Sequence, residues 1–139
     1  MDPSEDTYAY ATVPYATDSE LAAYADAPEV EIISNTEDCQ ALRKSSIGYA
    51  SFVFYNAGAC EDIEVSEPCI VNLYESNGIL ELSVCDPTMK LDSITVTVRR
   101  RLALKDSDLK VSVSEGENTV ISVDSTRSVG RPYSARFEA

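Results

Sequence analysis

Arg99, Arg100 and Arg101 form the one cluster of basic side chains in the sequence. An arginine guanidinium binds a carboxylate through two parallel hydrogen bonds. In an alternating strand Arg99 and Arg101 share a face, so these two are the candidate substrate-binding residues. Two alternatives remain: contact with an acidic patch on another domain, or a solvated strand end that protects a sheet edge. We favour the solvated strand end.

Histidine is absent from the whole chain. The sequence therefore lacks the commonest general base, the usual partner of a catalytic Ser or Cys, and the commonest zinc ligand. An acidic run comprises Glu61, Asp62, Glu64 and Glu67, but it does not have the spacing of an EF-hand loop. A solvated loop is favoured there over a calcium site. We predict no catalytic residue, no metal and no cofactor in this chain.

The four cysteines are Cys39, Cys60, Cys69 and Cys85, and none forms a C-x-x-C pair. An even number fits two disulfides in an oxidising compartment, and the alternative is four buried thiols in a cytosolic protein. Cys60 and Cys69 flank a polar stretch, which favours joining them and leaves Cys39 for Cys85. The rival pair is Cys69 with Cys85, which would lie opposite each other across a hairpin.

Composition sets the limits on size and partners. A chain of 139 residues with 44% apolar residues suits one globular domain, or one domain and part of another. A net charge of −13 disfavours nucleic acid as a partner, because binding to phosphates needs Lys and Arg. No apolar run is long enough to span a membrane. The N-terminal residues MDPSEDTYAY do not resemble a secretion signal, so no signal peptide is visible in this chain.

The first 28 residues differ from the rest in pattern. DTYAYATVPYA is expected to form a strand that ends at Pro14. TDSELAAYADAP predicts a short helix over 17–25, with Thr17 as the N-cap and Glu20 completing a capping box. Four tyrosines in this segment are suited to stacking on sugars: Tyr8, Tyr10, Tyr15 and Tyr24. Their spacing favours packing or a domain interface instead.

From residue 29 onward the sequence predicts short antiparallel strands. The expected strand centres are Val53, Val71, Leu82, Val96, Val111 and Ile121. Asn77-Gly78 between two apolar runs predicts a tight hairpin, and Asp86-Pro87 begins the next turn. Tyr49 and Tyr55 share a strand with two phenylalanines and are expected in the core. About nine short strands, spaced in this way, predict an all-β antiparallel sandwich that follows a strand-helix linker segment.

The order of residues is distinctive in four stretches: YAYATVPYATDSELAAYADAP, VEIISNTEDCQALR, IGYASFVFYNAG and LELSVCDPTMKLDSITVTV. They resemble the C-terminal part of polysaccharide lyase family 8, which includes hyaluronate, chondroitin and xanthan lyases. The first is similar to the segment that closes the family's central β domain, and the second to the opening of its C-terminal sandwich. In the third, Tyr55 stands where the family usually has Trp. The fourth resembles a hairpin whose turn is Asp86-Pro87-Thr88.

The resemblance implies that residues 1–28 end a preceding central β domain and its linker, and that residues 29–139 form the C-terminal sandwich. The family performs β-elimination beside a uronic acid, with Asn, His, Tyr and Arg on an upstream helical toroid that nothing here matches. We therefore expect a non-catalytic module of an extracellular lyase with a structural or carbohydrate-associated role. The cysteines depart from the family pattern and suggest a secreted variant.

The expected partners are upstream lyase domains and a polysaccharide of the hyaluronan, chondroitin or xanthan type, with neither nucleic acid nor a membrane. An alternative is a stand-alone secreted sandwich, stapled by disulfides, that binds a glycan or a protein. An independent enzyme is a third interpretation. The missing histidine and the lack of any paired catalytic groups disfavour it.

Overall fold

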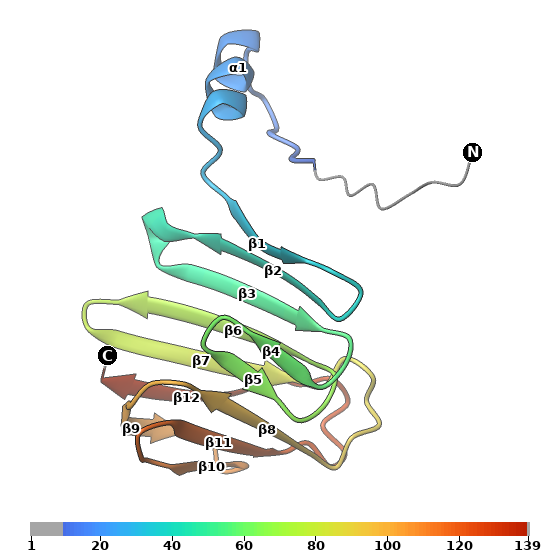
Figure 1. The fold of residues 1–139 in the computed structure, drawn as a ribbon, viewed down its shortest axis with the longest axis vertical. Helices are drawn as coiled ribbons and strands as arrows, with labels where there is room; N and C mark the ends of the chain where they lie inside the picture. Colours follow the sequence, from blue (N-terminus) through green and yellow to red (C-terminus); the bar gives the residue numbers. More distant parts are fainter. Residues whose placement is uncertain (1–9, 139) are drawn as a thin grey trace.

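The computed structural model describes residues 10–138, which form two antiparallel sheets packed face to face and preceded by one helix (Figure 1). The seven-stranded sheet runs in the order β1 (Glu31–Asn35), β2 (Cys39–Lys44), β3 (Tyr49–Phe54), β6 (Cys69–Ser76), β7 (Ile79–Cys85), β12 (Tyr133–Glu138) and β9 (Ala103–Ser107). The five-stranded sheet runs β10 (Val111–Ser114), β11 (Thr119–Asp124), β8 (Ser93–Val98), β5 (Ile63–Val65) and β4 (Gly58–Cys60). The predicted all-β antiparallel sandwich is confirmed.

The period-two pattern of the strands builds the core between the sheets. On β8, Ile94, Val96 and Val98 are buried, while the threonines between them are partly exposed. On β3, Phe52 and Phe54 are buried and their rings stack with centroids 6.2 Å apart. Because alternate side chains of a strand point to opposite faces, each sheet turns one apolar face inward. All six predicted strand centres lie in strands of the structure.

Twelve strands occur within residues 10–138, against about nine predicted. The short strands β4 and β9 were missed, because three to five residues carry little periodicity. CQALRK, which the sequence left as strand or helix, forms β2. EDIEVS, predicted as a polar connection or an edge strand, contributes β5, which lies inside its sheet between β4 and β8.

The N-terminal helix α1 (Asp18–Asp26) begins as predicted. The Thr17 hydroxyl accepts a hydrogen bond from the Glu20 backbone N–H at 3.4 Å, and the Glu20 carboxylate accepts one from the Thr17 N–H at 2.7 Å. This capping box satisfies free donors at the helix start. None of the helix residues is buried, and the helix extends away from the sandwich (Figure 1). No helix in residues 10–138 is long and apolar enough to cross a membrane.

The strand predicted to end at Pro14 is not observed in residues 10–13, which have no regular structure. The remainder of that predicted strand, with Tyr8, lies outside the described residues. Tyr10 and Tyr15 are exposed, and Tyr24 is half-buried. Residues 10–13 therefore do not pair with any strand in the described part of the chain, and strand propensity alone does not make them a strand.

The Asn77-Gly78 turn joins β6 to β7 in the predicted hairpin. Ser76 pairs with Ile79, and both central residues have positive φ angles of 53° and 73°. These angles match a type I′ turn, whose twist suits neighbouring antiparallel strands.

The prediction that Asp86-Pro87-Thr88 is a hairpin turn is wrong. β7 pairs with β6 and β12 in one sheet, whereas β8 pairs with β11 and β5 in the other. The segment therefore crosses from sheet to sheet. Seven residues separate Cys85 from Ser93, which is long for a tight hairpin turn and allows the chain to change layers.

The Asp86 side chain organises this crossing. Asp86 is buried, and one carboxylate oxygen accepts hydrogen bonds from the Thr88 N–H at 2.8 Å and the Thr88 hydroxyl at 2.6 Å. The other oxygen accepts the N–H groups of Lys90 and Leu91, each at 2.8 Å. Burial alone would raise the pKa of Asp86, but these hydrogen bonds outweigh it and lower the pKa below its usual value.

Candidate functional site

A cleft of about 420 Å³ opens between the two sheets, at the end of the sandwich where β3 begins and β6 ends. Its floor is apolar and consists of inward-facing side chains of the seven-stranded sheet: Ala50, Phe52, Leu73 and Leu80. The opposite wall comes from the turn between β4 and β5 and from the residues that follow β8. We call this space the inter-sheet cleft.

Charged side chains form the rim of the inter-sheet cleft, and its arginines are already paired. Arg43 contacts the carboxylate of Glu61, and it lies 3.6 Å from that of Glu31. Arg100 reaches the Glu75 carboxylate at 3.3 Å, and its buried Nε–H has no partner. Each guanidinium is therefore matched by an acidic side chain within reach.

The rim as a whole carries more acid than base. Two arginines, Arg43 and Arg100, face three carboxylates that line the same cleft: Glu61, Asp62 and Glu75. An additional carboxylate from a uronic acid would meet net negative charge, and like charges brought together at close range are unfavourable. The cleft thus offers a shallow apolar surface with paired charges around it rather than a site for an anion.

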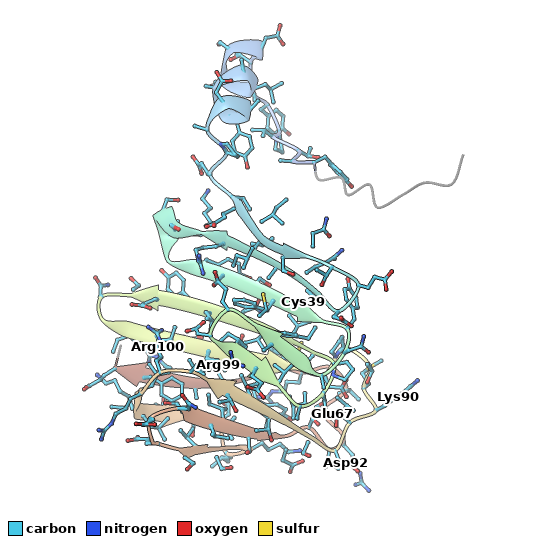
Figure 2. All side chains as sticks on the ribbon, in the orientation of Figure 1. Cys39, Glu67, Lys90, Asp92, Arg99 and Arg100 are labelled. Carbon is cyan, nitrogen blue, oxygen red and sulfur yellow. The ribbon has the colours of Figure 1, made fainter. Side chains whose placement is uncertain are left out.

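The two predicted site residues do not converge on the cleft. β8 ends at Val98, so Arg99 and Arg101 lie beyond the end of the strand. Arg99 is exposed and pairs with Glu64 at 3.1 Å, and Arg101 is exposed as well. Arg100, on the opposite side of the chain, lines the cleft instead (Figure 2).

Sequence reasoning missed Arg100, although a signal for it was present. Ile94, Val96 and Val98 occupy the inner face of β8, and the same alternation carried two residues further places position 100 on that face. The predicted solvated role fits Arg99 and Arg101, both of which are exposed.

Two residues of the acidic run form ion pairs. Glu61 contacts Arg43 from the turn between β4 and β5, and Glu64 contacts Arg99 from β5. Within residues 10–138 no group of three or more His, Cys, Asp or Glu side chains is placed to hold a metal ion. Half-exposed pairs of this kind contribute roughly 0–1 kcal/mol each to stability.

A second surface lies on the outer face of the seven-stranded sheet, near its β1 edge. A shallow hollow of about 310 Å³ is lined by Tyr10, Ile32, Leu42, Val53 and polar neighbours. Ile32 and Leu42 are directly opposite each other in the β1–β2 register and are 52% and 38% exposed. We call this surface the outer hollow. These neighbouring exposed apolar side chains make the outer hollow a candidate surface for contact with another domain.

The expectation that Tyr49 and Tyr55 serve the core is wrong. The alternation of β3 buries Phe52 and Phe54, so Tyr49 points to the opposite, outer face. Tyr49 donates a hydrogen bond to the Asn72 side chain at 2.9 Å, and Tyr55, just past the strand, is 49% exposed.

All four cysteines are free thiols, and the strand order is incompatible with part of the predicted pairing. Cys39 on β2 and Cys85 on β7 are separated by β3 and β6, and they point to opposite faces. The rival pair fails for a related reason. Cys69 faces the core, whereas Cys85 shares the outer face with the exposed side chains of β7.

Residues 31–95 match the family model described as "Polysaccharide lyase family 8, C-terminal beta-sandwich domain". The chain is 31% identical over 133 residues to a hyaluronate lyase of Thermasporomyces composti, which covers 94% of this chain and 17% of that protein. The chain belongs to polysaccharide lyase family 8. It represents the C-terminal β-sandwich domain of a family 8 protein. A xanthan lyase of Bacillus sp. (strain GL1) is 25% identical over 141 residues, covering 98% of this chain and 15% of that protein.

Solved structures of other lyases share the fold. A Paenibacillus xanthan lyase superposes with a TM-score of 0.85 at 24% identity, covering 90% of this chain and 12% of that one. A Streptomyces coelicolor A3 chondroitin AC lyase gives a TM-score of 0.79 at 17% identity, covering 88% and 17%. The family 8 chain described here thus spans less than a fifth of the length of these relatives.

Proposed function

We propose that the chain is the non-catalytic C-terminal module of a secreted lyase that cleaves uronic-acid-containing polysaccharide by β-elimination. The match to the family's C-terminal sandwich, confined to 17% of the hyaluronate lyase, carries this proposal. The inter-sheet cleft supports it, because paired arginines over an apolar floor do not supply a general acid and base. Polymers of the kind named in the relatives are too large to enter a cell, which favours an extracellular location.

The module's work in this proposal is structural, and its partner is the preceding part of the same polypeptide. Residues 1–28 would close that preceding domain and link it to the sandwich of residues 29–139. The outer hollow offers Ile32 and Leu42 as contact residues beside Tyr10. The helix α1 buries none of its residues within this chain, so it too is available for contact.

A chimera tests this role. Residues 10–138 would replace the aligned portion of the Thermasporomyces composti hyaluronate lyase, and we expect a folded protein that degrades hyaluronan. The double variant Ile32→Glu/Leu42→Glu should lower the melting temperature of the chimera by several degrees, since it places charge in the proposed interface. The same variant should change the isolated chain much less.

The matched control is Leu109→Glu, because Leu109 is fully exposed away from the outer hollow. It should leave the chimera unchanged. If Ile32→Glu/Leu42→Glu destabilised the isolated chain as much as the chimera, the outer hollow would not be the interdomain surface. The structural role would be contradicted by a chimera with the wild-type surface in which the module folded but made no contact with the rest of the lyase.

Glycan binding is a second candidate function, favoured by a tyrosine pair. Tyr49 and Tyr74 lie directly opposite each other on β3 and β6, and Tyr74 is 48% exposed. Neighbouring aromatic rings on a sheet face suit stacking on sugars. This candidate ranks second because a net charge of −13 repels a polyanionic glycan. Loss of hyaluronan binding in Tyr74→Ala, but not in Tyr55→Ala, would establish it.

A further inference from the structure

Cys39 and Cys60 approach each other from opposite sheets. Cys39 begins β2 in the seven-stranded sheet, is 5% exposed and belongs to the core. Cys60 ends β4 in the five-stranded sheet, packs against the same core, and pairs in register with the fully buried Ile63. Both side chains therefore point into the space between the sheets. Figure 2 shows Cys39 beside the β4–β5 hairpin.

Contacts on both sides hold the two cysteines at this position. On one side the Asp38 backbone oxygen accepts the Tyr55 N–H at 2.8 Å, and the Asp38 carboxylate accepts the Asn56 side-chain amide at 2.7 Å. On the other side Arg43, at the far end of β2, contacts Glu61. The segment that carries Cys60 is thus tied to β2 before and after the cysteine.

The two thiols also differ in their reactivity. Burial is the main cause that raises the pKa of Cys39 to about 12, and the neighbouring Cys60 contributes in the same direction. Cys39 is therefore a poor first nucleophile. Cys60 is only partly buried, so an external oxidant meets Cys60 first.

Neither Cys69 nor Cys85 is placed to bond with Cys39. Cys39 and Cys69 lie on the two strands that flank β3, with Phe54 between them in register. Two strand spacings amount to roughly 9.5 Å, beyond the Cα separation that a disulfide spans. Cys85 faces the outer side of the sheet.

We propose that Cys39 and Cys60 form a single disulfide that joins the two sheets, while Cys69 and Cys85 remain thiols. The oxidant is a small or protein disulfide. The Cys60 thiolate attacks it to give a mixed disulfide and releases one thiolate of the oxidant. Cys39 then loses its proton, and its thiolate attacks the Cys60 sulfur of the mixed disulfide and releases the second thiolate of the oxidant. Overall, two protein thiols and one external disulfide become one protein disulfide and two external thiols.

Peptide mapping of the full chain tests the proposal without reference to any lyase activity, so its failure would leave the proposed function untouched. The chain is incubated with oxidised and reduced glutathione, alkylated, and digested without reductant by trypsin and a protease specific for glutamate. The four cysteines then fall in separate peptides of residues 38–43, 45–61, 65–75 and 82–90. We expect 38–43 linked to 45–61, and two titratable thiols per unfolded chain.

Four titratable thiols, a link that contains 65–75 or 82–90, or a link between two chains would each overturn the pairing. Stability provides a second readout. Reductant should lower the melting temperature of the oxidised wild-type chain by roughly 10 °C, because the bond closes a loop of about twenty residues. Cys60→Ala should be insensitive to reductant, whereas the control Cys85→Ala should keep the shift. A mapped bond whose reduction left the melting temperature unchanged would refute the joining role.

Discussion

Two connections at the ends of β7 resemble each other in sequence and differ in structure. Before β7, Asn77-Gly78 turns the chain back within one sheet, and Ser76 pairs with Ile79. After β7, the chain that starts at Asp86 leaves the seven-stranded sheet and enters the five-stranded one. Both connections lie between alternating apolar strands and both begin with a turn-forming residue.

The difference lies in what determines each conformation. The first connection is short, and the positive φ angles of Asn77 and Gly78 set its course locally. The second is longer, and four hydrogen bonds to the buried Asp86 carboxylate set its course. A turn determined by backbone preference can be predicted from two residues, whereas one determined by a buried side chain depends on the packing around it.

Replacing Asp86 should have the largest effect. In Asp86→Asn one carboxylate oxygen becomes an amide N–H₂, which faces the N–H donors of Lys90 and Leu91 and leaves them without an acceptor. We expect the free energy of unfolding in urea to fall by about 2–4 kcal/mol. Asp92→Asn is the matched control, because the Asp92 side chain is exposed on the same connection. Equal effects of the two substitutions would contradict the role of Asp86.

Lowering the pH should gradually remove the contribution of the Asp86 carboxylate to the free energy of unfolding. The pKa of Asp86 is lowered in the folded state, so the carboxylate stabilises the fold above the unfolded-state value of about 3.8. That contribution is lost as the pH falls through the lower, folded-state pKa. The stability difference between wild type and Asp86→Asn should therefore be constant near neutral pH and shrink below about pH 4. A difference that stayed constant down to pH 2 would show that the charge plays no part.

A substitution in the hairpin turn should lower the free energy of unfolding by less, because backbone strain is its only effect. Gly78 has a φ of 73°, and a Cβ added there would meet no other atom within 4 Å. Gly78→Ala should therefore cost about 1 kcal/mol in the free energy of unfolding. Gly58→Ala, where the added Cβ is equally free and φ is not positive, should cost less. The reverse order would show that the turn does not depend on the positive φ of Gly78.

Local signals in the sequence were sufficient for much of the fold. Thr17 and Glu20 predicted the helix start, because a capping box involves only residues three apart. The alternation around Val96 predicted which residues of β8 face inward. Local signals could not predict which sheet contains β8, because its pairing with β11 and β5 joins strands that are distant in sequence.

The candidate site was harder to predict than the fold. Arg100 lies where a strand ends, and its approach to Glu75 depends on how the two sheets pack. The proposed Cys39–Cys60 bond likewise joins strands of different sheets, so the spacing of the two cysteines in sequence carried no information about it. Tyr55 was assigned to the core from its neighbours, although strict alternation places it opposite Phe54.

An eliminase assay on the purified chain tests most directly whether this module is non-catalytic. The chain is incubated with hyaluronan, chondroitin sulfate and xanthan, and the ultraviolet absorbance of unsaturated uronate products is followed. We predict no product above a heat-denatured control with any of the three polymers. Turnover that co-purifies with the folded chain and disappears in Arg100→Ala, but not in Arg101→Ala, would contradict the proposal and place an active site in the inter-sheet cleft.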